Sequence, residues 1–420
     1  MDVNAGAYLD GTPMEQLTLE MFELTLKIAS GTRSKGERAG HAQVSIWRNW
    51  KQTSVPTSEL FKGSHFSGQG LTLKDGRPSF CGLFKALRRN GRRTSDQVGL
   101  ILPTSLCASQ IAKMSAEQLN LKGLGRNRHV SRFVSLLHTE GCGHSGGVTE
   151  EMYSRTMLGY LNHPLVGFAL LLEHGCEKMH NDYMRHQAEQ QGVDLSHHGW
   201  ASVQLDGGIE RVLHKIEGWF EETITHTPAP SIEETGLEGL RLGLMASGPV
   251  PRSVAELIGD MAFTVCAAGG TIVVPHNSPL LSQQAFLACT LGSASPEPSL
   301  DYGQRAASAG LHIMETPTDH WIETLTGMGA TGVEMFIAHI GDRPQQGHPL
   351  VPLLQCSGDP VVLASHAEDL DLSLIGDPAS WNDALLRLVL KLASREYFPK
   401  TLLQGNHDFQ LTRGLVGVSL

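Results

Sequence analysis

The sequence predicts an α/β fold made of two Rossmann-like lobes, with mainly parallel sheets and a crevice between them. From residue 98 onward, short apolar runs end at Gly, Cys or His, and amphipathic stretches of helical length follow them. The alternation begins again after residue 237, and 420 residues exceed what one compact domain usually holds. Because open parallel sheets bind ligands at the carboxyl ends of their strands, we expect the site there.

The first lobe is predicted over residues 96–226. Its strands are the apolar runs at 98–103 and those that end at His138, Glu173 and Asp206. Residues 107–120 and 208–222 place apolar side chains three and four apart, which is typical of crossover helices. The segment 227–237 is rich in Pro, Thr and acidic residues and is interpreted as a linker.

The second lobe is predicted over residues 238–420. Strands are expected at 241–246, 271–275, 311–316 and 333–340, where the runs are apolar and short. An amphipathic helix is expected at 380–394. These elements repeat the strand and helix alternation of the first lobe.

Two further segments precede the first lobe. Residues 67–95 are interpreted as a linker that ends in a cationic turn, RRNGRRTS, and this turn could clamp a carboxylate through two parallel hydrogen bonds. A bare run of charges is otherwise solvated surface. Residues 1–66 contain LTLKIASG at 24–31, which is repeated as LVLKLASR at 388–395. The repeat favours an internal duplication.

Composition excludes several classes of protein. The net charge is -10, so an extended nucleic-acid partner is not expected. No apolar run approaches the roughly 20 residues that span a bilayer, and the start has no signal-peptide pattern, so we expect a cytoplasmic protein that binds no membrane. Seven cysteines argue against a disulfide framework and leave thiols for metal binding or chemistry.

Cysteines and histidines collect after the predicted strands of the first lobe. Because parallel strands bring such loops to one edge, we expect these side chains to converge on one pocket. The residues concerned are Cys107 after the first strand, His138, Cys142 and His144 after the second, and His174, Cys176 and Glu177 after the third.

The chemistry of this cluster leaves alternatives open. Three cysteines could hold an iron ion or three corners of an iron–sulfur cluster, and zinc in a closed site is less attractive because no CxxC pair occurs. The segment 173–180 is expected to open a helix, whose amides would favour a thiolate at Cys176. The alternatives are core cysteines and a flexible glycine turn with solvated histidines.

Five motifs in this order resemble those of altronate and galactarate dehydratases, and sulfolactate lyases share the same lobe. They cover about ninety residues. They stand here as Asn90-Gly91-Arg92, Leu102-Pro103-Thr104 with Cys107, His138 with Cys142, Arg155-Thr156 with Gly159-Tyr160 and His163-Pro164, and Gly175-Cys176-Glu177.

Residues 1–31 look like the carboxyl terminus of the same family, and the last fifty residues are a weaker version of it. The resemblance therefore implies a homo-oligomer or a part of a longer tandem protein. Two features depart from the family pattern: its small amino-terminal domain is not seen, and Met245–Pro251 replaces a Cys-Gly-Gly-Ser-Asp type of loop.

The resemblance implies a hydro-lyase that removes water from a small-molecule sugar acid and gives a 2-keto-3-deoxy acid. Fe2+ is the implied cofactor, with Mn2+ or an iron–sulfur cluster as alternatives, and such chemistry needs a base, an acid and a cation near the enediolate. The expected groups are His138, His144 and Glu177 for catalysis, Cys107, Cys142 and Cys176 for metal, and Arg92, Thr104, Arg155 and His163 for substrate.

Two rival functions remain. The altered loop at Met245–Pro251 favours an inactive or partner-dependent member of the family, whereas the three retained thiols favour an enzyme. A nucleotide-dependent oxidoreductase is ranked lowest, because no strand is followed by a GxGxxG loop together with a ribose-binding acid.

Overall fold

The computed structural model describes residues 82–142, 147–292 and 296–412, all within one compact unit, Val55–Leu420. The expected segment 1–66, most of the expected linker 67–95 and His144 lie outside the described residues. No helix among those described is long and apolar enough to cross a membrane.

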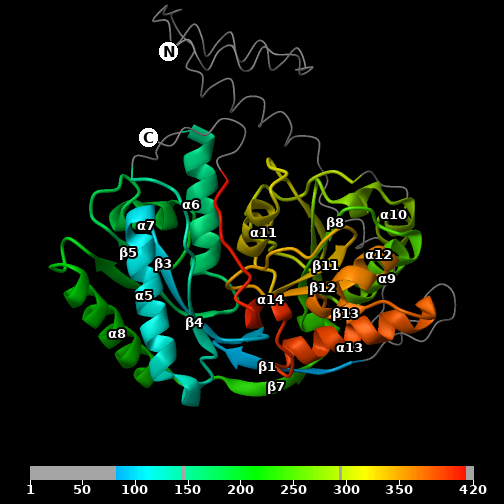
Figure 1. Cartoon of the computed structure of the whole chain (residues 1–420). Coiled ribbons are helices and arrows are strands. Elements are labelled where there is room, and N and C mark those ends of the chain that lie inside the picture. The colour runs from blue at the N-terminus through cyan, green and yellow to red at the C-terminus, as the bar shows by residue number, and fades with distance from the viewer. Residues whose placement is uncertain (1–81, 143–146, 293–295, 413–420) are drawn as a thin grey trace, which may run out of the picture. The chain divides into compact units, whose positions relative to one another are not determined.

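The first lobe is a parallel sheet in the order β4-β3-β5-β6 (Figure 1). Side chains alternate across it, as a pleated strand requires: Phe168, Leu170 and Leu172 pack toward one cluster, and Ala169 and Leu171 toward another. Its elements are β3 (Val98–Pro103), α5 (Leu106–Lys122), β4 (Arg132–Ser135), α6 (Gly147–Leu161), β5 (Val166–Glu173), α7 (Asn181–Gln190), β6 (Gly199–Ser202) and α8 (Ile209–His226).

The second lobe is a parallel sheet in the order β10-β9-β8-β11-β12-β13. Every predicted strand of this lobe is confirmed within a few residues, as is the helix α13. The elements are β8 (Arg241–Ser247), α9 (Arg252–Ala267), β9 (Thr271–Pro275), α10 (Gln284–Thr290), β10 (Gly310–Met314), α11 (Trp321–Ala330), β11 (Met335–Ile340), β12 (Leu353–Ser357), α12 (Pro360–His366), β13 (Leu372–Ser373), α13 (Trp381–Ala393) and α14 (Lys400–Leu403).

Two segments interpreted as linkers are strands. β1 (Phe84–Arg89) and β2 (Arg92–Thr94) form a hairpin, and β7 (Ser231–Thr235) pairs with the other edge of β1, all antiparallel. Asn90 and Gly91 turn the hairpin with φ of 47° and 76°, which is the double positive φ that an Asn-Gly turn favours. The cationic turn is therefore a rigid hairpin.

The two lobes share one core. The helices α6 and α11 pack side by side (Figure 1), and residues of both sheets belong to one buried cluster. Small residues permit this approach, because a Cβ added at Gly159 would lie 2.6 Å from the carbonyl oxygen of Ala330. The Tyr160 hydroxyl donates to the Thr326 carbonyl oxygen across the junction at 2.7 Å.

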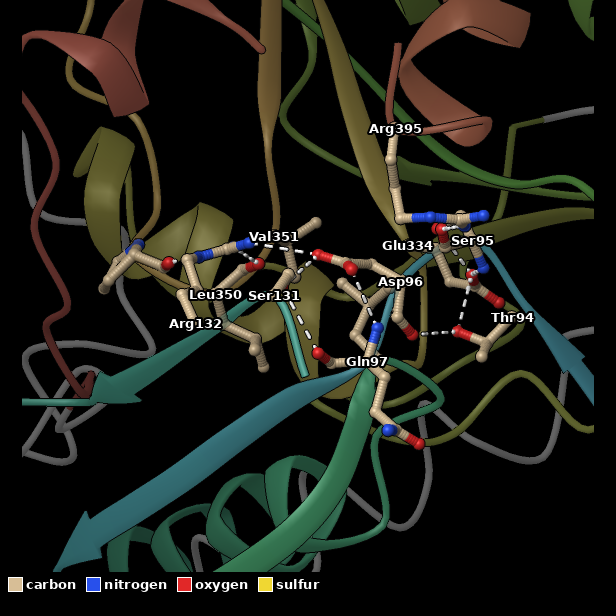
Figure 2. A network of polar contacts seen from close by, with 12 residues as sticks. Thr94, Ser95, Asp96, Gln97, Ser131, Arg132, Glu334, Leu350, Val351 and Arg395 are labelled. Carbon is tan, nitrogen blue, oxygen red and sulfur yellow. Dashed lines mark hydrogen bonds and ion pairs between the residues drawn. The ribbon is translucent and has the colours of Figure 1, made fainter. Parts of the chain in front are cut away.

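A polar network fastens the chain between β2 and β3 to the second lobe (Figure 2). The buried Glu334 accepts hydrogen bonds from the Ser95 amide at 2.6 Å and the Ser95 hydroxyl at 2.8 Å. The Arg132 guanidinium pairs with Asp96 at 3.1 Å and donates to the Leu350 carbonyl oxygen at 2.8 Å. The lobes are thus joined by hydrogen bonds as well as by apolar packing.

Candidate active site

The three predicted thiols lie together at the carboxyl edge of the first sheet. Cys107 is in the first turn of α5, Cys142 follows β4, and Cys176 follows β5. The thiols of Cys107 and Cys176 each interact with the thiol of Cys142. The sequence placed these residues on three separate loops, and the structure brings them into one cluster, called here the thiol cluster.

Backbone hydrogen bonds hold the three loops together. The Leu106 amide donates to the Glu140 carbonyl oxygen at 2.7 Å, which joins the loop after β3 to the loop after β4. The Lys178 amide donates to the Cys142 carbonyl oxygen at 3.0 Å, which joins the loop after β4 to the loop after β5. The positions of the thiols are therefore fixed by the main chain.

The Glu177 carboxylate is the centre of this arrangement. Its Oε1 accepts from the Thr104 hydroxyl at 2.7 Å and the His174 amide at 2.8 Å, and its Oε2 accepts from the Gly175 amide at 2.7 Å. Burial alone would raise the pKa of Glu177, but these hydrogen bonds outweigh it and lower the pKa to about 2. A carboxylate held in this way organises the loop and is a poor carrier of protons at neutral pH.

His138 is also committed to the backbone. Its ring is buried, Nε2 lies 2.9 Å from the Pro103 carbonyl oxygen, and Nδ1 accepts from the Glu140 amide at 3.2 Å. Because Nδ1 accepts a hydrogen bond, the proton belongs on Nε2. His138 thereby ties the end of β3 to the loop after β4.

The thiols themselves are kept protonated. Burial first, and then the neighbouring Cys142 and Glu177, raise the pKa of Cys107. The same causes raise the pKa of Cys176, whose Sγ also lies 3.4 Å from Nδ1 of His174. The helix expected to open at Cys176 begins only at Asn181, so its amides do not favour a thiolate there.

Among the described residues, no group of three or more His, Cys, Asp or Glu side chains that could hold a metal ion is found. The backbone and two hydroxyls engage His138 and Glu177, so the three thiols are the donors that remain in the cluster. No step of a reaction is therefore assigned to a metal here.

His174 was predicted to converge on this site but was given no role by the sequence analysis. It directly follows β5, is half-buried, and lies within hydrogen-bond distance of Cys176 and of Gln204, 3.5 Å away. Its contact with the thiol cluster appears only in the folded chain.

The four predicted substrate-binding residues lie in different places. Thr104 is buried against Glu177, and Arg155 holds Asp301 at 3.1 Å and the Tyr302 carbonyl oxygen at 2.8 Å. His163 joins the lobes, with Nε2 2.9 Å from the Val333 carbonyl oxygen, and burial lowers its pKa to about 3. Arg92 is in the hairpin and lines a cleft at the amino edge of the sheet.

The loop after β4 does carry a GxGxxG spacing, at residues 141–146, between a strand and the helix α6. The next strand, β5, ends at Glu173, where a ribose-binding acid would be expected. The Glu173 side chain is buried and accepts from the Asn181 amide at 2.6 Å. This carboxylate is thus engaged in the fold, which argues against nucleotide binding.

The altered loop of the second lobe is closed by contacts with its own chain. The Pro249 carbonyl oxygen lies 2.1 Å from the position that a Cβ on Gly341 would take, and His339 Nε2 lies 3.1 Å from the same oxygen. The Ser247 hydroxyl donates to Asp342 at 2.7 Å. In the described part of the chain, no group of three or more His, Cys, Asp or Glu side chains that could hold a metal ion lies at this edge.

Comparison with known families gives two matches. Residues 87–226 match the family model for the second domain of D-galactarate dehydratase/altronate hydrolase, and residues 1–52 match the model for the C-terminal part of D-galactarate/altronate dehydratase. No curated protein matches the sequence.

Similarity to solved structures is weak. A nickel-free carbon monoxide dehydrogenase from Thermococcus sp. AM4 is 9% identical, with a TM-score of 0.20 and coverage of 76% of this chain and 61% of that chain. An acetyl-CoA synthase/carbon monoxide dehydrogenase is 10% identical, with a TM-score of 0.20 and coverage of 75% and 59%. The chain spans about three fifths of these two structures, and such scores carry no argument.

Proposed function

Since the chain belongs to the galactarate/altronate dehydratase family through residues 1–52 and 87–226, we propose that it is a carbon–oxygen lyase acting on a sugar acid. The substrate is of the altronate or galactarate type. Loss of water across the carbon next to the carboxylate and its neighbour gives an enol that becomes a 2-keto-3-deoxy acid. The observation that carries the proposal is the convergence of Cys107, Cys142 and Cys176 at one strand edge.

The chemistry needs a base for the proton beside the carboxylate and an acid for the departing hydroxide. His174 is the proposed base, because its ring is partly open to solvent and contacts the thiol cluster. The thiols of Cys107 and Cys176 are the proposed acids, since a raised pKa keeps them protonated at neutral pH. His144 remains a further candidate outside the described residues, while His138 and Glu177 act as positioning residues.

The test is anaerobic incubation of the chain with altronate, galactarate and sulfolactate, followed by measurement of α-keto acid. We expect product from a sugar acid, and a rate lower by about 100-fold in His174→Asn, as is usual for loss of a proton-transfer group. His214→Asn, an exposed histidine on α8, is the matched control and keeps the full rate. Full activity in His174→Asn and Cys176→Ser would contradict the assignment.

Iron is the alternative to thiol acids, because the three thiols would bind it as thiolates and could not then donate a proton. Anaerobic titration of the chain with Fe2+ tests it, together with Mn2+ as the alternative metal and a Cys142→Ser variant. Retention of metal by Cys142→Ser would rule out the thiol cluster as the metal site. An iron–sulfur cluster would be distinguished by inorganic sulfide and by its visible absorption.

The second candidate is an inactive or partner-dependent copy. The observation that favours it is the closed loop at Pro249 and Gly341, which leaves the second lobe without an open site edge in its described residues. A homo-oligomer or a longer tandem protein would then supply the missing groups. Absence of product with the chain alone, and its appearance with an active family member, would support this candidate.

A further inference from the structure

A large cleft lies at the opposite end of the molecule from the thiol cluster. It has a volume of about 1350 Å³ and is lined by residues of both lobes. The first lobe contributes the start of β5 and the end of α8, and the second contributes Gly239 and Arg241 at the start of β8. The cleft therefore opens at the amino ends of the two parallel sheets, away from the carboxyl edge where the sequence predicted the site, although Arg92 and His163, which were predicted to bind substrate, line it.

The walls of this cleft are strongly cationic. Two carboxylates, Asp194 and Glu238, line it against six arginines, which are Arg88, Arg89, Arg92, Arg93, Arg241 and Arg305. Burial and then the charges of Arg92 and Arg241 lower the pKa of Arg305, and burial and then Arg92 lower the pKa of Arg89. Guanidinium groups from the hairpin, from β8 and from the loop before β10 thus repel one another across the cleft.

The nearby carboxylates Glu233, Glu238 and Glu334 are already engaged, and their arginine partners are Arg88, Arg93 and Arg241. Glu233 pairs with Arg88 at 3.3 Å and with Arg93 at 2.5 Å. Glu238 accepts from the Thr235 hydroxyl at 2.9 Å, and Glu334 is bound to Ser95 (Figure 2) and lies 3.8 Å from Arg241. Within the described residues, no carboxylate lies within 4.0 Å of Arg92 or Arg305.

Repulsion of this kind destabilises the folded chain unless an anion lies between the charges. Arginine is well suited to this role, because its planar guanidinium binds carboxylate or phosphate through two parallel hydrogen bonds. The net charge of -10 disfavours an extended polyanion, so a small anion is the expected ligand.

We propose that Arg92, Arg241 and Arg305 form a binding site for a small organic dianion, with its charges on carboxylate or phosphate groups. The site is distinct from the thiol cluster. The eight residues of β5 separate the two ends, which corresponds to roughly 25 Å of extended chain. A ligand bound in the cleft cannot also contact the thiols, so the site does not depend on the proposed lyase activity.

Calorimetric titration of the full chain at low salt tests the site, with galactarate as the dicarboxylate probe and pyrophosphate as the phosphate probe. We expect binding of at least one probe, weakened about tenfold or more in the double variant Arg92→Gln/Arg305→Gln. The matched control is Arg252→Gln/Arg387→Gln, which removes two equal charges from exposed helix surfaces. The stronger probe identifies the anionic group.

Three results would overturn the proposal. Binding of neither probe would show that the cleft is not an anion site. Equal weakening in the control variant would show a general charge effect. Loss of binding in Cys142→Ser would place the ligand at the thiol cluster, whereas retained binding with no lyase activity would leave the cleft standing and count against the proposed function alone.

Discussion

The carboxyl edges of the two parallel sheets are built in opposite ways. In the first lobe, the buried Glu177 accepts hydrogen bonds from amides and hydroxyls and ties the loops after β3 and β5 together, and the thiols of Cys107 and Cys176 are exposed beside it. In the second lobe, Pro249 packs directly on Gly341, and the loop bonds to its own neighbours.

The difference shows that the fold alone does not create a site. Both lobes have parallel strands and crossover helices, yet the cysteines of the second lobe serve packing. Cys356 is 1% exposed, and burial raises its pKa to about 12. A buried carboxylate that organises the loops beside exposed thiols distinguishes the reactive edge from the closed one.

The largest expected effect is the loss of Glu177. In Glu177→Gln, a neutral amide group replaces the carboxylate, so the surrounding hydrogen-bond donors lose their anionic acceptor. We expect the free energy of unfolding to fall by about 3 kcal/mol. Chemical denaturation measures it, with Glu189→Gln on the exposed face of α7 as the control, expected to change by less than about 0.5 kcal/mol. Equal stability of the two variants would show that Glu177 does not hold the loops.

Closure of the second edge is tested by Gly341→Ala. An added Cβ would meet the Pro249 carbonyl oxygen at 2.1 Å, so we expect a loss of about 2 kcal/mol in the free energy of unfolding. Gly218→Ala is the control, because nothing lies within 4 Å of its Cβ and it sits within α8. Alanine there should stabilise the helix slightly. An unchanged stability in Gly341→Ala would mean that the loop moves freely.

The two edges should also respond to different ranges of pH. Burial lowers the pKa of His339, so the folded chain keeps this ring neutral while the unfolded chain takes up a proton below about pH 6.5. Stability is therefore lost as the pH falls below that value, at up to about 1.4 kcal/mol per pH unit. The lowered pKa of Glu177, about 2, means that its contribution is present above pH 4.5 and is lost between 4.5 and 2.

Denaturation as a function of pH separates these contributions. His339→Gln should flatten the curve between pH 6.5 and 5, and Glu177→Gln should flatten it below 4.5. If His339→Gln altered only the acid range below 4.5, the assignment of the two windows would be wrong.

Long apolar runs made most of the fold predictable. The strands at 98–103 and 166–173 are buried along their length, and a continuous apolar run has few other structures available to it. β7 was not predicted because its residues are polar and mostly exposed. Such a composition occurs in a solvent-exposed strand and in a linker alike. The Asn-Gly turn of the first hairpin was overlooked because the four neighbouring arginines suggested solvated surface, although the dipeptide itself predicts a hairpin.

The location of the site could be predicted from the sequence, but the roles of its residues could be predicted less well. The ends of parallel strands indicated where the thiols meet, but the partners of His138 and Glu177 are main-chain amides and carbonyl groups. Their positions depend on tertiary packing and leave no pattern in the sequence. Arg92 was predicted to bind a carboxylate, but the cleft was not predicted, because Arg241 and Arg305 come from segments that meet Arg92 only in the folded chain.

The contrast between the two edges is tested most directly by alkylating the native chain and identifying the modified cysteines by mass spectrometry. We predict that Cys107 and Cys176 react in the folded protein, while Cys356 reacts only when the chain unfolds. Modification of Cys356 at the same rate as Cys107 and Cys176 under native conditions would contradict the account of an open first edge and a closed second one.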